Sequence, residues 1–326
     1  MLRSLLAAIT ATICIAVTAL QISGCTAVTQ SGRETRSNLA IDFNNRGIAY
    51  QNKGDYDRAI QDYDQAIRLK PDYAKLFYNR GLAYRAKRDY DRAIQDYDQA
   101  IRLKPDYAEA FDNRGIAYLE KGAYDRAIQD HDQAIRLKPD YADAFNNRGN
   151  AYRAKRDNHR AIQDYDQAIR LKPDYAIAFD NRGNVYQNEG DYDRAMQDYD
   201  QAIRLKPDFA SAFESRCQTR AIAIIATTTL EAALSDCNES LRLRPDDAKT
   251  LHLRGFVYFR MGRYDEAIAD FDKRLSRDPK SADSLYLRGL AKRMRPDIAG
   301  SDADIAAAKT IDPKVAQRYA SYAVRP

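Results

Sequence analysis

Asparagine side chains recur at one fixed place in a sequence that repeats itself about every 34 residues. A carboxamide offers both a hydrogen-bond donor and an acceptor, so it can bind the N–H and C=O groups of another polypeptide regardless of that polypeptide's sequence. Spaced one per repeat, such side chains would form a ladder along an extended peptide. The five asparagines are Asn45, Asn79, Asn113, Asn147 and Asn181.

A second interpretation of these asparagines stays open. The repeats are so similar that one asparagine could have been copied four times, without selection on each copy. A single hydrogen bond contributes only about 0.5–1.5 kcal/mol net, so peptide binding would require several asparagines to act together.

Catalytic and metal-binding patterns are far weaker in this sequence. Its three histidines, His131, His159 and His252, fall at different positions of different repeats, which disfavours a metal site. Nucleophile-elbow, zinc-protease, phosphate-loop and dinucleotide-binding motifs do not occur. We therefore predict a protein that is not an enzyme and uses no cofactor, metal ion or small-molecule substrate.

The repeats that position the asparagines are helical. Prolines recur at intervals of 34 residues from Pro71 to Pro207 and, after one interval of 38, again from Pro245 to Pro313. Apolar residues within each repeat follow the 3–4 spacing of amphipathic helices, and no segment alternates with period two. The fold class is therefore all-α, with five near-consensus repeats in 40–209, a degenerate sixth repeat with an insertion in 210–247, two repeats in 248–315 and a C-terminal cap in 316–326.

Local signals divide each repeat into two helices. Gly54, Gly122, Gly190 and Gly262 are placed to end first helices, and aspartates such as Asp55 to cap second helices. Asp72, Asp106, Asp140 and Asp174 are predicted to cap the following first helices. On the second helices, Arg58–Asp62 and Asp64–Arg68 are predicted to form exposed ion pairs four residues apart.

The residues at positions 4, 8, 11, 20, 24, 27 and 32 resemble the tetratricopeptide repeat. In the third copy they are Phe111, Gly115, Tyr118, Ala127, His131, Ala134 and Pro139. The resemblance implies a right-handed superhelical solenoid of about eight antiparallel helix hairpins, with a concave groove lined by first helices. It also implies a protein or peptide partner, and the asparagines resemble the ladder that holds peptide backbones in the repeats of O-GlcNAc transferase.

Further groove residues are predicted from the first helices, whose groove side varies between copies while second helices are nearly identical. Uneven gene conversion is an alternative explanation of this contrast. The predicted groove residues besides the five asparagines are Lys75, Tyr78, Asn150 and Asn184. The lysine and arginine pattern that clamps C-terminal carboxylates in chaperone-binding members of the family is missing.

The first 25 residues differ from the rest. An apolar run from Leu5 to Leu20 precedes Ile22-Ser23-Gly24-Cys25, which resembles the lipobox of bacterial lipoproteins. The resemblance implies a signal peptide over 1–24, lipidation of Cys25 and a polar tether over 25–39, although an uncleaved anchor is the alternative. Because Thr26 is not the aspartate that retains lipoproteins in the inner membrane, the outer membrane is favoured, with the protein facing the periplasm.

Two other cysteines, Cys217 and Cys237, lie in the sixth repeat. Their positions are diagonal across the helix hairpin, which predicts a Cα separation beyond the limit of about 7 Å and disfavours a disulfide.

Charge excludes one class of partner. The 52 basic and 47 acidic residues give a net charge of +5, but they are interleaved within each repeat and form no basic stripe. We therefore predict no nucleic-acid partner. The expected function is a membrane-anchored interaction scaffold, with a structural spacer or self-assembling array as the alternative.

Overall fold

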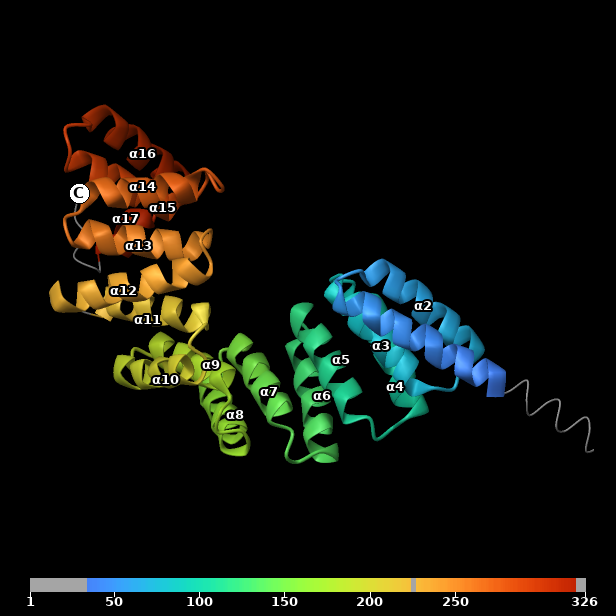
Figure 1. Cartoon of the computed structure of the whole chain (residues 1–326). Helices are drawn as coiled ribbons and strands as arrows, with labels where there is room; N and C mark the ends of the chain where they lie inside the picture. Colours follow the sequence, from blue (N-terminus) through green and yellow to red (C-terminus); the bar gives the residue numbers. More distant parts are fainter. Residues whose placement is uncertain (1–33, 224–226, 321–326) are drawn as a thin grey trace, which may run out of the picture. The chain divides into compact units, whose positions relative to one another are not determined.

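The computed structural model describes residues 34–223 and 227–320, which form helices joined by short loops, without a strand (Figure 1). The predicted signal peptide, Cys25 and the tether up to residue 33 lie outside these residues. No helix in the described part is long and apolar enough to span a membrane. The first helix occupies residues 34–52, and the others are α2 (Tyr56–Leu69), α3 (Ala74–Ala86), α4 (Tyr90–Leu103), α5 (Ala108–Glu120), α6 (Tyr124–Leu137), α7 (Ala142–Ala154), α8 (Asn158–Leu171), α9 (Ala176–Asn188), α10 (Tyr192–Leu205), α11 (Ala210–Ala223), α12 (Thr227–Leu243), α13 (Ala248–Arg260), α14 (Tyr264–Leu275), α15 (Ala282–Arg293), α16 (Ile298–Ile311) and α17 (Val315–Ala320).

These helices fall into two compact units, unit 1 up to residue 151 and unit 2 from residue 152. In unit 1 the helix at 34–52 contacts α2 through Arg46–Asp62 and Gly47–Tyr63, and α3 pairs with α4 and α5 with α6. In unit 2 the pairs are α9 with α10, α11 with α12, α13 with α14, and α15 with α16. Helices α3, α5, α7, α9, α11, α13 and α15 begin at the alanines that open the repeats in the sequence. The prediction of an all-helical repeat of hairpins is confirmed for the described residues.

Loop chemistry explains most helix ends. Gly54, Gly122, Gly190 and Gly262 all have positive φ angles, between 74° and 80°, which glycine adopts without steric cost. The carboxylate of Asp55 accepts a hydrogen bond from the backbone N–H of Arg58, at 3.1 Å, and so caps α2. Three of the four predicted caps of the first helices are wrong, however. Tyr73, Tyr107 and Tyr175 occupy the N-cap positions of α3, α5 and α9 and make no side-chain cap bond, so Asp72, Asp106 and Asp174 lie one residue too early.

A glycine–ring contact brings the two helices of a hairpin together. A Cβ atom added to Gly81 would lie 2.7 Å from Cε1 of Tyr97, whose side chain is fully buried. In the third repeat, Gly115 meets His131 in the same way, which places this histidine in the core. The same contact joins Gly47 to Tyr63, Gly183 to Tyr199 and Gly255 to Phe271.

Arginine side chains join each hairpin to the one before it. Nε and Nη2 of Arg80 donate to Asp96 in its own hairpin, at 2.8 and 2.6 Å, while Nη1 donates to Asp64 of the preceding hairpin, at 2.6 Å. Equivalent two-sided pairs are made by Arg114, Arg182, Arg216 and Arg288.

This arrangement corrects the prediction of exposed pairs within the second helices. Asp62 is buried and binds Arg46 at 2.6 and 2.7 Å, whereas Arg58 pairs with the cap Asp55. Asp64 pairs with Arg80 rather than with Arg68. A carboxylate that faces the other helix of its hairpin can form a bidentate contact with an arginine there. No neighbour on its own helix can provide such a contact.

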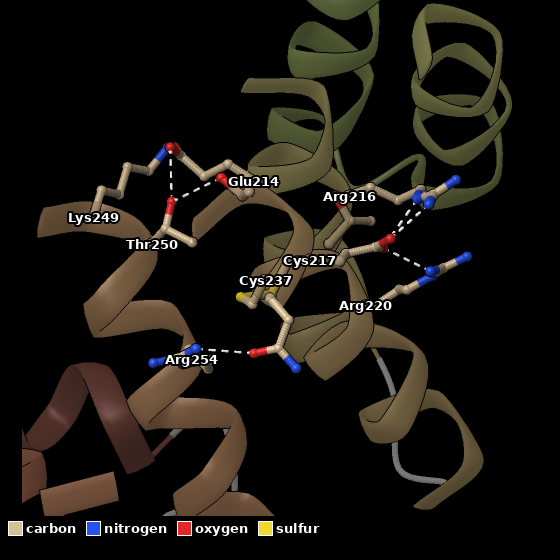
Figure 2. Close-up of a disulfide and its surroundings, with 12 residues drawn as sticks. Glu214, Arg216, Cys217, Arg220, Cys237, Lys249, Thr250 and Arg254 are labelled. Carbon is tan, nitrogen blue, oxygen red and sulfur yellow. Dashed lines mark hydrogen bonds and ion pairs between the residues drawn. A yellow bond between two sulfur atoms is a disulfide. The ribbon is translucent and has the colours of Figure 1, made fainter. Parts of the chain in front are cut away.

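The prediction against a disulfide is also wrong, because Cys217 and Cys237 are bonded with Cα atoms 5.5 Å apart (Figure 2). The reason is the register of the insertion. Arg216 binds Asp236 across 20 residues, where Arg182 binds Asp198 across 16. The four extra residues therefore fall between the paired segments of α11 and α12, and Cys237 takes the place of Tyr199, opposite Cys217 in the place of Gly183.

Helix α17 covers one end of unit 2. Its residues Val315 and Tyr319 are buried. The ring of Tyr319 stacks on Tyr286 at 5.9 Å between centroids, and its hydroxyl lies 3.1 Å from Nε2 of His252. These contacts shield the last hairpin from water on the side facing α17.

Candidate functional site

The predicted asparagine ladder lies on first helices, and its amide groups bind neighbouring repeats within unit 1. Nδ2 of Asn79 donates to Oδ1 of Asn44, at 2.8 Å. Nδ2 of Asn113 donates to the carbonyl of Glu109, at 2.8 Å, and to the hydroxyl of Tyr78, at 3.2 Å. Asn79 and Asn113 thus each bind a side chain on the first helix of the preceding repeat, Asn44 and Tyr78 respectively.

The third link of this series ends on a carboxylate. Nδ2 of Asn147 donates to both oxygens of Asp112, at 3.1 and 3.2 Å. Asp112 is buried, and its Oδ1 also lies 2.8 Å from Nδ1 of the buried His131. The histidine in the third repeat is therefore tied to the same polar chain as the asparagine ladder.

These contacts change the interpretation of the five asparagines. Asn79 and Asn113 are only 7% and 8% exposed, and the amide donors of Asn79, Asn113 and Asn147 bind other side chains or backbone. These three amide nitrogens therefore hold neighbouring parts of unit 1 together. Asn45 is exposed and Asn181 is half-buried. Contact of any of the five with a peptide stays a prediction.

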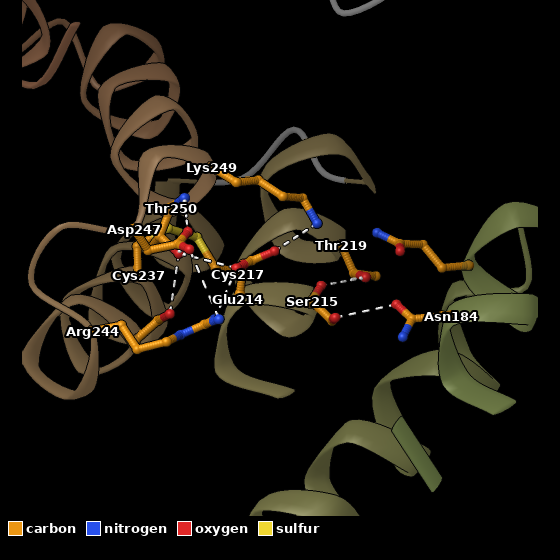
Figure 3. A network of polar contacts seen from close by, with 12 residues as sticks. Asn184, Glu214, Ser215, Cys217, Thr219, Cys237, Arg244, Asp247, Lys249 and Thr250 are labelled. Carbon is orange, nitrogen blue, oxygen red and sulfur yellow. Dashed lines mark hydrogen bonds and ion pairs between the residues drawn. A yellow bond between two sulfur atoms is a disulfide. The ribbon is translucent and has the colours of Figure 1, made fainter. Parts of the chain in front are cut away.

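Asn150 and Asn184 are both half-buried. In unit 2, Oδ1 of Asn184 accepts hydrogen bonds from the hydroxyls of Tyr199 and Ser215, each at 3.2 Å. Asn184 therefore joins α9 to α10 and α11, as the view in Figure 3 shows for Ser215.

Lys75 and Tyr78, the remaining predicted groove residues, line a hollow of about 600 Å³ in unit 1. The rings of Tyr78 and Tyr107 lie 5.0 Å apart and are tilted by 37°, and Nζ of Lys104 lies 4.8 Å from the centre of the Tyr107 ring. The complete lining is Asp72, Tyr73, Ala74, Lys75, Tyr78, Leu103, Lys104, Tyr107 and Glu109.

The hollow has an aromatic wall and a charged rim. Burial raises the pKa of Tyr78, so its hydroxyl stays protonated and can donate a hydrogen bond while it accepts one from Asn113. Lys75 and Asp72 are exposed at the rim. A hollow of this kind can accommodate an apolar side chain and bind the polar backbone on either side of it.

Sequence reasoning missed Tyr73, Lys104 and Tyr107. Their signal is the segment Lys-Pro-Asp-Tyr that follows the second helix in the first four repeats (Lys-Pro-Asp-Phe in the fifth), of which only the proline and the aspartate were used. In the structure the lysine of this segment lies over the ring of the tyrosine, as with Lys70 and Tyr73, 4.9 Å from the centroid. These residues come from the loops between hairpins, so their position beside Tyr78 depends on how the hairpins stack.

A second polar cluster in unit 2 joins α11 to α13 (Figure 3). Glu214 is only 7% exposed, and its carboxylate pairs with Lys249 at 2.6 Å and with Arg244 at 3.0 Å. It also accepts a hydrogen bond from Thr250, at 3.3 Å. Two cations thus compensate one buried charge, which makes the cluster a structural contact between neighbouring hairpins. No group of three potential metal ligands lies close together in the described ranges.

Asp180, on α9 beside this cluster, predicts a dependence of stability on pH. Burial raises the pKa of Asp180 from 3.8 to about 6, and its Oδ1 has no hydrogen-bond partner among the described residues. Because the folded pKa exceeds the unfolded one, the contribution of Asp180 to stability is fully present below pH 3.8 and is lost as the pH rises through about 6.

We expect Asp180→Asn to be more stable than the wild type at pH 8, by about 1–3 kcal/mol, because the variant buries no charge. Near pH 4 the two proteins should differ little. Urea unfolding at both pH values measures the difference, and equal gaps at pH 4 and pH 8 would show that Asp180 does not titrate as described.

Comparison with known families agrees with this architecture. Models of the tetratricopeptide repeat match residues 44–108, 115–155, 149–190, 178–209 and 219–292. The chain belongs to the tetratricopeptide repeat family. Such repeats generally build scaffolds for protein–protein interaction, and no enzyme family is among the matches.

Solved structures show the same fold. A tetratricopeptide repeat protein from Parabacteroides merdae ATCC 43184 is 18% identical, with a TM-score of 0.59 over 83% of this chain and 99% of its own. Pseudomonas aeruginosa pilF is also 18% identical, with a TM-score of 0.56 over 66% and 96%. The complex of Cut9 with Hcn1 from the APC/C gives 13% identity and a TM-score of 0.65 over 85% and 54%. A comparison with curated proteins found no match.

Proposed function

We propose that this scaffold binds an extended segment of a partner protein along the first helices of unit 1, with one apolar side chain of the partner in the hollow beside Tyr78. The observation that carries this proposal is the hollow itself. Three tyrosine rings form its walls, and charged side chains stand at its rim. Tyrosine provides a large contact area at low conformational cost, which suits it to recognition surfaces.

The asparagine ladder contributes to partner binding indirectly, through the packing of unit 1. By binding Tyr78, Asn113 fixes the orientation of a ring in the hollow. Replacing the asparagines would therefore disturb the packing of unit 1 as well as any peptide contact. Substitutions inside the hollow are the more specific test.

The first test of the hollow is Tyr78→Ala in the full chain. We expect partners that co-purify with the wild type from the native envelope to be lost, because the substitution removes the wall that contacts Tyr107. Tyr78→Phe keeps the ring and should retain most binding. Lys309→Ala on α16 is exposed and serves as the control. Equal recovery of partners with Tyr78→Ala and Lys309→Ala would contradict the proposal.

We also propose that the scaffold is anchored by lipid at Cys25, preferably to the outer membrane, and faces the periplasm. The segment Ile22-Ser23-Gly24-Cys25 supports the anchor. The disulfide between Cys217 and Cys237 supports export, because disulfides persist in oxidising compartments.

The mass of the mature protein tests the anchor. We expect a chain that starts at Cys25 and carries additional acyl mass, and we expect Cys25→Ala to lack that mass and to leave the membrane fraction. A wild-type chain that retains residues 1–24, or that starts at Cys25 without acyl groups, would contradict lipidation.

A further inference from the structure

The sixth repeat replaces the glycine–ring contact of the other hairpins by a disulfide. The pair Arg216–Asp236 takes the place of Arg182–Asp198 in the fifth repeat. The residues that follow them, Cys217 and Cys237, are therefore equivalent to Gly183 and Tyr199. Gly183 packs on the ring of Tyr199 in the fifth repeat, and Cys217 is bonded to Cys237 in the sixth. Neither a glycine nor a ring remains at this level of the α11–α12 pair.

Two separate thiols would fill this position poorly. A cysteine side chain is much smaller than the tyrosine ring that it replaces, and both sulfurs lie in a core where Cys217 and Cys237 are 0% exposed. The surrounding core includes Ala221, Ala233 and Val257. Without the covalent bond, the two helices lose the contact that a ring provides in neighbouring repeats.

We propose that the Cys217–Cys237 disulfide is an assembly lock, which allows the sixth repeat to close only after its thiols have been oxidised. In this step the two thiols give up two electrons and two protons to the disulfide of a thiol oxidoreductase, which leaves as a dithiol. Because both cysteines are fully buried in the closed repeat, an oxidoreductase must act while α11 and α12 are still apart.

Closure of the sixth repeat also positions the seventh. Glu214 on α11 holds Lys249 and Thr250 at the start of α13 (Figure 3). Ser240 on α12 also lies 3.2 Å from the Thr250 hydroxyl. A sixth repeat that stays open would release these contacts. The lock thereby makes ordering of α13 depend on oxidation, and the proposed export to the periplasm supplies the oxidising environment.

The experiment uses the full chain purified in detergent, so its outcome does not depend on the cellular location or on the hollow in unit 1. The protein is unfolded in urea and refolded with or without a phosphine reductant, and peptide mapping verifies the Cys217–Cys237 bond. Hydrogen exchange is then measured in α11, α12 and α13. We expect at least about tenfold lower protection in the reduced protein. Helices α2 to α6 provide the internal reference and should not change.

Two variants distinguish the effect of the disulfide on protection from the effect of the residue types at positions 217 and 237. Cys217→Ser/Cys237→Ser should resemble the reduced protein under both conditions. Cys217→Gly/Cys237→Tyr restores the contact of the other repeats, and in reductant it should be protected at least about tenfold more than the reduced wild type. The proposal is overturned if the reduced wild type or the double serine variant is protected to within about twofold of the oxidised wild type. Equal protection of the reduced wild type and the glycine–tyrosine variant would also overturn it, because the disulfide would not then replace the glycine–ring contact.

Discussion

Arg114→Ala is expected to destabilise unit 1 by about 3–5 kcal/mol, because it leaves a buried carboxylate without its cation. The side chain of Asp130 is only 8% exposed and receives two hydrogen bonds from Arg114, at 2.6 and 2.8 Å. Burial raises the pKa of Asp130, and Arg114 acts in the opposite direction. The substitution also breaks the 2.5 Å bond to Asp98, and with it the connection to the preceding hairpin.

Urea unfolding followed by circular dichroism measures this loss, and hydrogen exchange in α5 and α6 locates it, since repeat arrays do not always unfold in one step. Arg58→Ala is the matched control, because Arg58 is an exposed arginine that pairs with the half-buried cap Asp55. We expect a much smaller change there. Similar losses for the two variants would show that the buried pairs do not hold the repeats together.

Gly81→Cys is expected to destabilise unit 1 by about 1–3 kcal/mol, because any Cβ at this position meets the buried ring of Tyr97 at 2.7 Å. The sixth repeat shows how a side chain is tolerated there, since Cys217 occurs opposite a second cysteine instead of a ring. Gly81→Cys/Tyr97→Cys should therefore form a disulfide when oxidised and recover part of the lost stability.

Thermal unfolding with and without reductant measures both variants. Because reductant also cleaves the native Cys217–Cys237 bond, both variants are made in the Cys217→Gly/Cys237→Tyr background, where only the double variant should change its midpoint when reductant is added. A Gly81→Cys protein as stable as the wild type would contradict the account of the hairpin contact.

The fold was predictable because its determinants are local and repeated. The 34-residue spacing of prolines, the glycines that end first helices and the caps such as Asp55 each act within a few residues. The ion pairs were mispredicted for the opposite reason. A four-residue spacing suggested Arg58–Asp62, but Asp62 binds Arg46, 16 residues away on the partner helix. Pairing across a hairpin depends on which face is buried, and spacing within one helix does not specify it.

The candidate site was predictable only in part. Lys75 and Tyr78 were found from their place on a first helix, and both line the hollow in unit 1. Asn79 and Asn113 were placed on the correct helices, but their contacts with Asn44 and Tyr78 depend on the distance between successive repeats. The cysteine pair was misjudged because the register of four inserted residues becomes visible only in the packed helices.

The most direct test of the account is site-specific photo-crosslinking in the native envelope. A photoreactive phenylalanine in place of Tyr78 lies in the hollow, and the same group in place of the exposed Lys309 is the control. We expect position 78 to crosslink to a defined protein partner, and we expect the crosslink to weaken when Tyr107 is also changed to alanine. Crosslinks that are absent at position 78, or that are equal at positions 78 and 309, would contradict the central claim that the hollow receives a partner chain.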